Sequence, residues 1–407
     1  MEVKNENTTP KTIPNDVDKE QKGINVPNLR FPSFKSKWEK NYFKDELDLL
    51  KNNTLSRAEL NYKSGKIKNI HYGDILVKFE NSIYSNSKEI PYINEEYIPK
   101  NYKSMLLKSG DLIIADTAED YTVGKSVEII NNDENMVISG LHTIPCRPKQ
   151  NNFSLGYLGY YTNSPSFHNQ LLPLIQGIKV SSISKSQIKE TYISYPEKDE
   201  QEKIVNFLAL VNSRIHTQSK IIEQIKSQIK SICHIMCNIN DDTVKLKEVC
   251  FFENKTNHQS GEGLSSGKYI YFTNEEETTK YFNSYDFDGE YIIANTGGKA
   301  NFKYYNGKFA SMSDCLVVKC FKNVKTKFIL YSLLNCIEKI NHIGFVGSGL
   351  KHLDKDWFEN MSIPQYSIAH DKYLKLIDTL TLKLECEEFL LKKLKEQKKY
   401  LLSNMFI

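Results

Sequence analysis

Long apolar runs are missing from this 407-residue sequence. No uninterrupted apolar stretch approaches the roughly 18 residues that a membrane-spanning helix needs, and the N-terminus has no signal-peptide pattern. The eight cysteines show no framework spacing, so reduced thiols are expected. These absences predict a cytoplasmic protein without a membrane span or a disulfide scaffold.

Metal-binding patterns are scarce as well. The closest approach to one is Cys233-His234-x-x-Cys237. It lies inside a helical heptad pattern, where cysteine commonly serves as a small apolar residue. We therefore expect no bound metal in this chain.

Arginine is rare: Arg30, Arg57, Arg147 and Arg214 are the only four among 54 basic residues. The net charge of +4 is mildly basic and by itself indicates nothing about nucleic acid. If the chain reads base edges, bidentate arginine–guanine contacts must be few, and Lys, Asn, Gln, Ser and Thr have to serve instead.

The motifs of several common enzyme classes are also absent. Neither a G-x-x-x-x-G-K-[ST] loop nor a G-x-G-x-x-G pattern occurs. DNA adenine methylation calls for Asn or Asp, two prolines and an aromatic residue, whereas residues 163–167 read Asn-Ser-Pro-Ser-Phe. We therefore predict no ATP-driven motor, no dinucleotide site and no catalytic centre.

What the sequence does contain is an internal repeat. An apolar strand at 112–115 recurs at 288–294, and each copy opens into a polar loop. Gly-Ile-Lys at 177–179 recurs as Gly-Leu-Lys at 349–351. Two further matches are an apolar-x-Lys-x-x-apolar motif and a later proline: Ile183 to Ile188 with Pro196, and Leu353 to Phe358 with Pro364. Because the same motifs occur in the same order in both halves, the sequence predicts two domains with the same fold.

An acidic cluster in the first polar loop has the residue types of a nuclease metal site. It consists of Asp116, Glu119 and Asp120, and the second copy has Asn295, Thr296 and two glycines there. A loop that differs between the copies fits a variable reading surface better than a catalytic centre.

A long heptad pattern follows each proline, and adding 169 to the first set of apolar positions gives the second. The two sets are Ile204, Leu208, Val211, Ile215, Ile222, Ile225, Ile229, Ile232 and Met236, and Tyr373, Ile377, Leu380, Leu384, Leu391, Leu394, Leu401 and Met405. Gln218 fills one polar slot and maps onto Glu387, while Lys398 adds a second break. Each segment covers roughly 40 residues, hence about 60 Å of helix. We predict that the two helices pair antiparallel within the chain.

The predicted fold class is therefore α+β, with two α/β domains separated by two long antiparallel coiled-coil helices and a pseudo-twofold internal repeat. The expected ranges are a disordered polar tail at 1–25, a first domain at 26–196, a central long helix at 197–240, a second domain at 241–365 and a C-terminal long helix at 366–407.

With this organisation the chain resembles the specificity subunits of type I restriction–modification systems, over essentially everything after residue 25. The resemblance rests on Val-Pro-Asn-Leu-Arg-Phe-Pro-Ser-Phe at 26–34 with Trp38, Ile-His-Tyr-Gly-Asp-Ile at 70–75, Asp-Glu-Gln-Glu-Lys-Ile at 199–204, Ala-Asn-Thr-Gly-Gly-Lys at 294–299 and Tyr-Asn-Gly-Lys-Phe-Ala at 305–310. The sequence departs from the family at His370-Asp371, where the second helix should repeat Glu-Gln. Asp116 and Asn295 stand at strand ends that often carry Arg.

The resemblance implies a non-catalytic DNA-recognition subunit. Each target-recognition domain would read one part of an asymmetric bipartite site in double-stranded DNA, and the helix pair would set the unread gap. It also implies docking of two methyltransferase (modification) subunits, and usually of restriction (translocase) subunits. S-adenosylmethionine, ATP and magnesium are then expected only on those partners, with no cofactor on this chain.

Two alternatives stay open. A coiled-coil scaffold without DNA specificity would bind only protein, and no duplex would then compete better than random DNA. A lone adenine methyltransferase would require S-adenosylmethionine to bind the isolated chain.

Candidate DNA contacts lie on and near the polar loops, with lysines for phosphates and polar groups for bases. For any single lysine a solvated surface position is the alternative, and for His142 a hydrogen-bonded core position. The candidates are Thr117, Thr122, Lys125, His142 and Lys179 in the first domain, and Asn295, Thr296, Lys299, Lys303 and Lys351 in the second.

Overall fold

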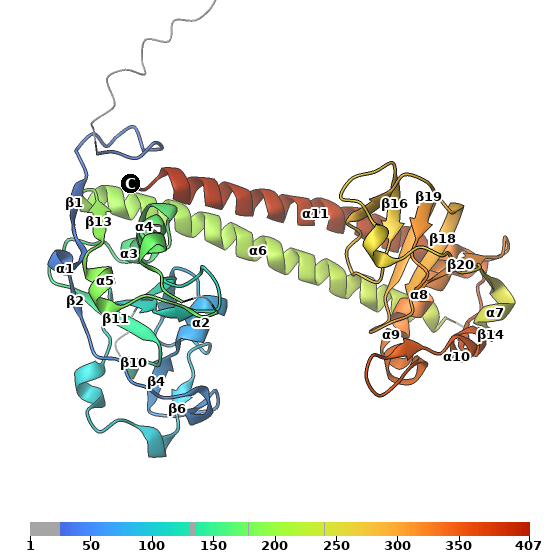
Figure 1. The fold of residues 1–407 in the computed structure, drawn as a ribbon, viewed down its shortest axis with the longest axis horizontal. Coiled ribbons are helices and arrows are strands. Elements are labelled where there is room, and N and C mark those ends of the chain that lie inside the picture. The colour runs from blue at the N-terminus through green and yellow to red at the C-terminus, as the bar shows by residue number, and fades with distance from the viewer. Residues whose placement is uncertain (1–24, 131–135, 178, 240) are drawn as a thin grey trace, which may run out of the picture. The chain divides into compact units, whose positions relative to one another are not determined.

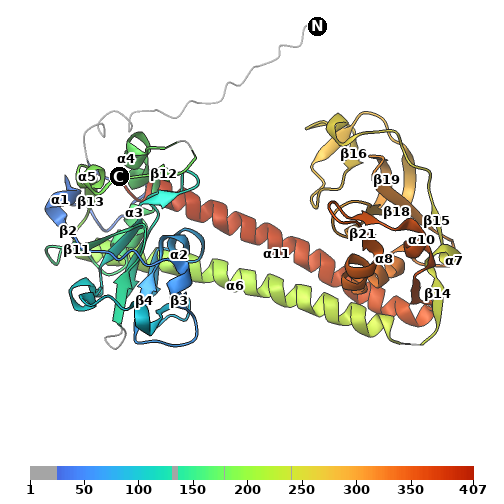
Figure 2. The same cartoon turned by 60° about the horizontal axis from the view of Figure 1, so that its bottom comes forward.

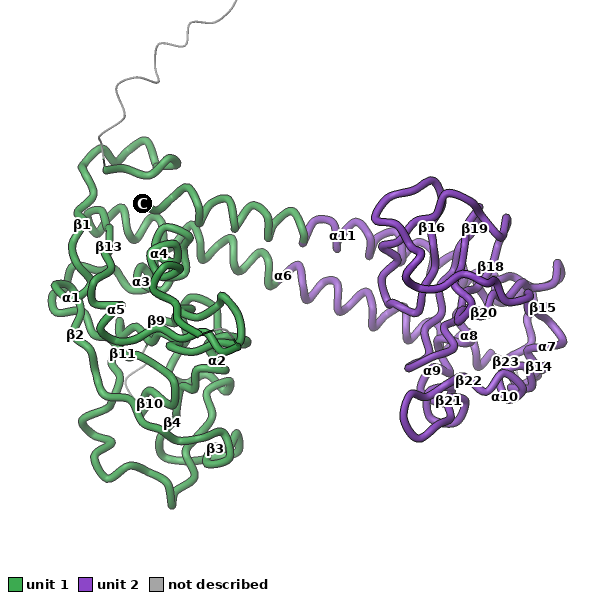
Figure 3. Tube along the Cα trace, viewed as in Figure 1, with its two compact units in different colours: residues 1–216, 392–407 green, residues 217–391 purple. Residues whose placement is uncertain are grey.

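The computed structural model describes the following parts of the chain: residues 25–130, 136–177, 179–239 and 241–407. The chain divides into two compact units (Figure 3). Unit 1 comprises residues 1–216 and 392–407, and unit 2 comprises residues 217–391. The expected tail at 1–25 lies outside the described residues except for Asn25. Within the described ranges no helix is long and apolar enough to cross a membrane.

Unit 1 is built on a five-stranded sheet with the order β2-β11-β7-β9-β5, of which β2 and β11 are labelled in Figure 1. Neighbours are antiparallel except β9 and β5, which are parallel. In the central strand, Leu112 and Ile114 join one buried apolar cluster, and Ile113 and Ala115 join another. Because both faces are covered, the strand reads as a continuous apolar run. The strands span Leu47–Leu49 (β2), Thr143–Pro148 (β11), Leu112–Ala115 (β7), Ser126–Ile130 (β9) and Ser82–Tyr84 (β5).

A four-stranded sheet and two strand pairs accompany this sheet in unit 1. The four-stranded sheet has the order β10-β4-β6-β3, while β1 pairs with β13 and β8 pairs with β12. These strands span Met136–Ser139 (β10), Ile67–Ile70 (β4), Tyr92–Ile93 (β6), Leu60–Asn61 (β3), Glu39–Tyr42 (β1), Tyr192–Tyr195 (β13), Thr117–Ala118 (β8) and Ser181–Ser182 (β12). The short helices span Phe43–Glu46 (α1), Tyr72–Val77 (α2), Tyr157–Thr162 (α3), Pro165–Leu171 (α4), Lys185–Lys189 (α5), Arg57–Glu59 (η1), Glu95–Tyr97 (η2), Tyr102–Met105 (η3) and Leu172–Leu174 (η4).

Unit 2 is built on a six-stranded sheet with the order β15-β20-β18-β19-β16-β17. Here β16 and β19 are parallel and the other neighbours are antiparallel. The strands span Cys250–Phe252 (β15), Cys315–Cys320 (β20), Phe287–Asn295 (β18), Phe302–Ser311 (β19), Tyr269–Phe272 (β16), Lys280–Phe282 (β17), and, in two further pairs, Thr243–Lys245 (β14) with Ser362–Pro364 (β23) and Phe345–Val346 (β21) with His352–Leu353 (β22). The short helices span Leu246–Val249 (α7), Thr326–Asn335 (α8), Ile337–Lys339 (α9), Lys355–Asn360 (α10), Ser260–Glu262 (η5), Ile340–Gly344 (η6) and Ile368–His370 (η7).

The two units repeat one order of elements, and the predicted internal repeat is confirmed. In unit 1 the elements β1, α1 and β2 come first, and β2 is an edge strand of the sheet β2-β11-β7-β9-β5. In unit 2 the elements β14, α7 and β15 come first, and β15 is the edge strand that starts the matching order β15-β20-β18-β19-β16. The short helices α5 and α10 are also equivalent: Ser184 and Asp354 cap their N-termini through side-chain oxygens. Ile188 and Phe358 are the matching fully buried residues. We call these matched elements the frame.

The two heptad segments form long helices, α6 (Lys198–Cys237) and α11 (Asp371–Asn404), drawn in Figures 1 and 2. In unit 1, Leu208 near the start of α6 shares an apolar cluster with Leu401 near the end of α11. In unit 2, Met236 near the end of α6 shares a cluster with Ile377 near the start of α11. The helices therefore pair antiparallel, as the heptads predicted.

The polar slots of the two heptad runs meet each other. Within unit 2, the side-chain nitrogen Nε2 of Gln218 donates to Glu387 Oε2 at 2.5 Å and to the Glu387 carbonyl at 3.2 Å. Gln218 is 6% exposed, so this amide is satisfied in an otherwise apolar seam. A polar pair in such a seam favours one register, because a slip would leave the buried amide without a partner.

Candidate nucleic-acid interface

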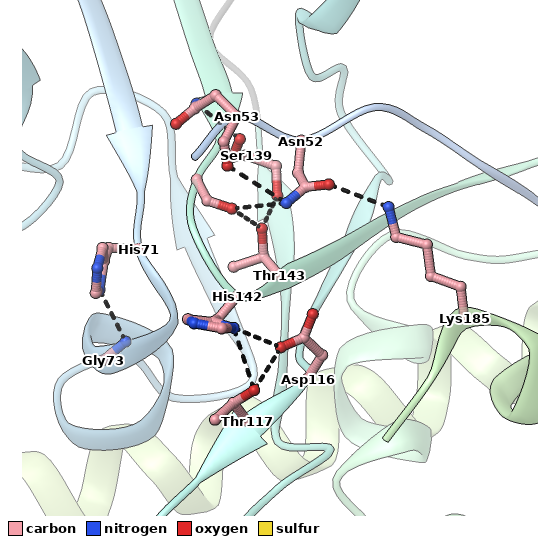
Figure 4. A network of polar contacts seen from close by, with 11 residues as sticks. Asn52, Asn53, His71, Gly73, Asp116, Thr117, Ser139, His142, Thr143 and Lys185 are labelled. Atoms are coloured by element: carbon pink, nitrogen blue, oxygen red, sulfur yellow. Dashed lines mark hydrogen bonds and ion pairs between the residues drawn. The ribbon is translucent and has the colours of Figure 1, made fainter. Parts of the chain in front are cut away.

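In unit 1 the loop after β7 brings two of the predicted residues together. Thr117 Oγ1 donates to Asp116 Oδ1 at 2.8 Å and lies 3.2 Å from His142 Nδ1 (Figure 4). His142 Nδ1 is also 3.3 Å from Asp116 Oδ1, and nearly half of the histidine side chain is exposed. The alternative core position for His142 is therefore wrong, and its ring forms part of a polar surface cluster.

The backbone that presents His142 is under constraint. His142 has a φ of +53°, the only positive φ among the described non-glycine residues. Such a conformation is uncommon outside glycine and has to be held by its surroundings. The edge of the His142 ring packs against Tyr72, with ring centroids 5.2 Å apart.

A polar network beneath the turn holds this backbone in place, also shown in Figure 4. The hydroxyls of Ser139 and Thr143 lie 2.6 Å apart, and Thr143 Oγ1 donates to the Gly140 carbonyl at 2.5 Å. Asn53 Nδ2 donates to the Ser139 carbonyl at 2.8 Å. The 52–53 segment reaches the surface through Asn52, whose Oδ1 accepts from Lys185 Nζ at 3.0 Å. Sequence reasoning missed these residues because they are distant in the chain and fit no motif.

His71 lies beside this cluster and is neutral at physiological pH. Burial, reinforced by the nearby Arg57 charge, lowers the pKa of His71 to about 4. Its Nδ1 therefore accepts a hydrogen bond from the Gly73 backbone N–H at 3.2 Å, which caps α2.

Two candidate lysines are engaged with backbone carbonyls. Lys125 Nζ donates to the Leu76 carbonyl at 2.9 Å, and Lys303 Nζ donates to the Glu275 carbonyl. Burial lowers the pKa of both ammonium groups. In this conformation both lysines anchor neighbouring segments, so a phosphate could reach them only if those bonds broke.

Thr122 and Lys179 lie at the surface of unit 1. The side chain and backbone N–H of Thr122 both donate to Asp120 Oδ1, at 2.5 and 2.8 Å, and lower the pKa of that carboxyl. Lys179 is exposed and follows a residue outside the described ranges. The structure therefore places Thr122 in a local turn and leaves Lys179 facing solvent.

A cleft of about 470 Å³ in unit 1 adds residues that the sequence did not suggest. Lys78, which directly follows α2, His168 from α4 and Lys398 from α11 line it together with Tyr121, which is 77% exposed, and the candidates Thr122 and Lys125. Lysines and an exposed aromatic ring are the side chains that contact phosphates and bases. No local pattern links these positions, because four separate segments contribute them.

In unit 2 the loop after β18 is closed by Asn295. Its Nδ2 donates to the Gly297 carbonyl at 2.9 Å and to the Lys299 carbonyl, and its Oδ1 accepts from the Asn301 N–H at 2.6 Å. Asn295 is 8% exposed. Its amide therefore builds the loop and is not free to meet a base.

Three other candidates of unit 2 gather around this closed loop. Thr296 accepts the Leu353 N–H at its carbonyl, 2.8 Å away, and the Lys351 carbonyl accepts the Gly298 N–H at 2.9 Å. These bonds fasten the loop to the segment that carries Lys351, whose side chain is exposed like that of Lys299. The structure thus presents two solvent-facing lysines from adjoining segments.

No group of three or more His, Cys, Asp or Glu side chains in the described part of the chain is placed to hold a metal ion. Cys233 and Cys237 lie in α6 with their side chains in the apolar core of unit 2, and His234 is exposed.

Known proteins resemble part of this chain in sequence. Two proteins of Mycoplasma pneumoniae, each named as a type I specificity subunit, are 30% and 27% identical to this chain over 176 and 180 residues, or 39% and 41% of it. The chain spans 44% and 65% of the lengths of these relatives.

Solved structures share the fold. A type I restriction–modification S subunit from M. genitalium matches with a TM-score of 0.58 and 15% identity, over 94% of this chain and 99% of that one. A chain from a study of complex assembly and conformational transition of the type I system matches with a TM-score of 0.52 and 13% identity, over 90% and 96%.

A family model described as "Type I restriction modification DNA specificity domain" matches residues 35–227 and again residues 239–400. The two matches cover the two copies of the frame, each with most of its long helix. Since they account for most of the sequence, the chain belongs to the family of type I restriction–modification DNA specificity proteins.

Proposed function

We propose that this protein is the sequence-specific DNA-binding specificity subunit of a type I restriction–modification complex. Each unit reads one part of an asymmetric bipartite site in double-stranded DNA. The observation that carries the proposal is a single frame occurring twice with unlike loops at equivalent places. Equal frames give equal docking on DNA, and unlike loops give unlike base contacts.

The reading surface of unit 1 centres on Thr117 and His142, with Lys179 and the cleft lined by Thr122 and Lys125 beside it. In unit 2 it centres on Thr296, Lys299 and Lys351, on the loop that Asn295 closes. Lys125 and Lys303 support these surfaces by holding backbone carbonyls, and they donate to DNA only after those bonds open. The scarcity of arginine fits readout by hydroxyl, imidazole and lysine groups.

The paired helices serve as the spacer between the two parts of the site and as the docking place for two methyltransferase subunits, with restriction subunits beyond them. A repeated element offers the same kind of surface twice, which suits two copies of one partner. In this proposal the chain itself catalyses nothing. S-adenosylmethionine, ATP and magnesium act on the partner subunits in the cytoplasm.

The experiment is to sequence the methylated DNA of a host that carries the modification subunit, with and without this chain. We expect one bipartite motif to be methylated only when the chain is present. A chimaera in which unit 2 is exchanged for that of a relative should change one part of the motif and keep the other. Methylation that does not depend on the chain, or binding in which no duplex competes better than random DNA, would favour the protein-binding scaffold instead.

A further inference from the structure

Two free cysteines face each other across neighbouring strands of unit 2. Cys250 is the first residue of β15 and Cys320 is the last residue of β20, and the two are paired in the ladder. Their sulfur atoms lie 3.5 Å apart, although 70 residues separate them in the chain.

The ladder places these cysteines at a position where side chains approach closely. The Phe321 N–H donates to the Val249 carbonyl at 3.0 Å, one residue beyond the pair on each strand. This is the pattern of a non-hydrogen-bonded antiparallel pair, in which the Cα atoms are about 4.5 Å apart. That separation falls within the range that a disulfide spans, so bond formation needs rotation of the side chains and no separation of the strands.

The two thiols differ in exposure and in acidity. Cys250 is 3% exposed, whereas Cys320 is partly exposed. Hydrogen bonds from the Cys250 thiol and from Thr326 lower the pKa of the Cys320 thiol, while the same contact with Cys320 and burial raise the pKa of Cys250. Cys320, the more exposed of the two, is therefore the thiol that an oxidant reaches first, and Cys250 lies beside it as the second thiol.

We propose that Cys250 and Cys320 form an oxidisable dithiol site that closes to a disulfide on exposure to hydrogen peroxide. The Cys320 thiolate attacks one peroxide oxygen, the O–O bond breaks, and the departing hydroxide takes up a proton to become water. The Cys250 sulfur then attacks the resulting sulfenic acid, the S–O bond breaks, and water leaves with the Cys250 proton. Two thiols are oxidised by two electrons in total, and one peroxide is reduced to two waters.

The site belongs to one copy of the frame only. The equivalent ladder position of unit 1 pairs Leu47 with Pro148, which cannot form such a bond. Oxidation therefore joins β15, which follows α7, to β20, which precedes α8, without altering the first copy. This inference is independent of the proposed function, because it concerns the chemistry of the folded chain alone.

The test uses the full-length wild-type chain, reduced and then freed of reductant. The protein is treated with hydrogen peroxide, quenched, denatured and alkylated with N-ethylmaleimide, and its peptides are mapped by mass spectrometry. We expect a linked peptide pair containing Cys250 and Cys320, loss of both alkylations in most molecules, and reversal by dithiothreitol. Full alkylation of both cysteines while the exposed Cys386 is oxidised would overturn the proposal, since simple accessibility would then govern the reaction.

Two variants sharpen this result. With Cys250→Ser, Cys320 should stop at the sulfenic acid, which dimedone captures with a defined mass increase. With Cys386→Ser as the matched control, the 250–320 link should form as in the wild type. Dimedone labelling of the wild type equal to that of Cys250→Ser would show that Cys250 does not resolve the intermediate. Should Cys250→Ser fail to fold, the wild-type peptide map decides the question without it.

Discussion

Units 1 and 2 share the frame and differ in what is attached to it. In unit 1 the frame carries an additional four-stranded sheet and strands β7 and β9 of four and five residues. In unit 2 the corresponding strands β18 and β19 extend to nine and ten residues. The shared part consists of the frame, whereas the differing part consists of the four-stranded sheet of unit 1, the lengths of the central strands and the loops. The frame therefore stays the same in the two copies while the parts attached to it differ.

Different interactions hold the polar loops after β7 and β18 in the two copies. In unit 1, Thr117 and His142 come from different segments and meet over a network of Asn, Ser and Thr side chains. In unit 2, one side chain, Asn295, closes the loop through three backbone bonds. Backbone bonds of Thr296 and Gly298 to the 351–353 segment also hold the loop of unit 2, whereas the cluster of unit 1 depends on side-chain contacts.

The starts of the two long helices differ as well. At the start of α6, Arg30 forms a two-pronged ion pair with the fully buried Glu200, with bonds of 2.7 and 2.6 Å. At the start of α11, His370 is fully buried, and its Nδ1 accepts from the Ser367 N–H at 2.9 Å. The departure from Glu-Gln noticed in the sequence thus replaces an ion pair by a hydrogen bond to the nearby backbone.

The largest effect is expected from shortening the spacer that connects the copies. Deleting the opposed segments 219–225 and 380–386 removes one heptad from each helix and keeps Gln218 opposite Glu387. Each helix loses about 10 Å, which corresponds to about three base pairs of DNA. Methylome sequencing should show the original motif lost and a motif with a shorter gap gained, with both half-sites unchanged. Altered half-sites would contradict a passive spacer.

Next in size is truncation of the equivalent core residues Phe358 and Ile188. Both are fully buried, and Phe358 also stacks against Phe302 at 5.9 Å between ring centroids. Phe358→Ala should destabilise unit 2 by about 3–5 kcal/mol, and Ile188→Ala should destabilise unit 1 by about 2–5 kcal/mol. Urea unfolding followed by hydrogen exchange resolved by peptide assigns each loss to a unit. Equal loss of protection in both units from either variant would show that the copies do not unfold separately.

The free energy of unfolding of unit 1 should depend on pH through the buried Glu128. Glu128 is buried, and desolvation raises its pKa from 4.5 to about 7, although the Gly156 and Gly159 N–H groups oppose that rise. Since the folded pKa is the higher one, the stabilisation is complete below about pH 4.5 and is lost as pH rises through about 7. The loss amounts to about 3 kcal/mol.

Glu128→Gln cannot ionise and serves as the reference. The difference in unfolding free energy between wild type and variant should fall steadily from pH 5 to pH 8, measured by urea titration at each pH. His71, with its lowered pKa, acts in the opposite direction between about pH 6.5 and 4, but it is present in both proteins and cancels. A difference that is constant with pH would contradict the raised pKa of Glu128.

The smallest effect concerns single lysines of the two reading surfaces. Lys299 is exposed, whereas Lys125 holds the Leu76 carbonyl. If Lys299 meets a phosphate, Lys299→Ala should weaken binding at low salt and reduce the slope of log K against log salt by about 0.9. Lys125→Ala should leave that slope unchanged. The measurement is fluorescence anisotropy with the assembled modification complex. A reduced slope for Lys125→Ala together with an unchanged slope for Lys299→Ala would show that the hydrogen bond of Lys125 to the Leu76 carbonyl opens on DNA.

The sequence predicted the repeated frame and the helix pair because both show in the sequence as a regular spacing of buried apolar residues. The heptads of α6 and α11 predicted the helix pair, and the apolar run at 112–115 predicted a strand, which the structure places at the centre of a covered sheet. The same logic found the polar slots at Gln218 and Glu387, which do meet. Periodicity reports which side of an element is buried, and that information is local in the chain.

The candidate site could be predicted less well from the sequence than the fold. Thr117 and His142 were proposed separately, and their contact depends on a positive φ and on support from Asn53 and Thr143. Lys125 and Lys303 were proposed as phosphate contacts, but the structure shows them bonded to backbone carbonyls. The residue types identified them as polar loop positions and carried no information about which carbonyl lies within reach.

By itself, then, the sequence determined that one fold occurs twice, that two long helices pair, and that arginine is scarce. Only the tertiary structure decided which polar groups of the loops are exposed, how His142 is presented, and that Cys250 lies against Cys320. The physical reason is that patterns of burial follow from neighbours a few residues away. Hydrogen-bond partners and thiol contacts follow from segments that meet only after the chain has folded.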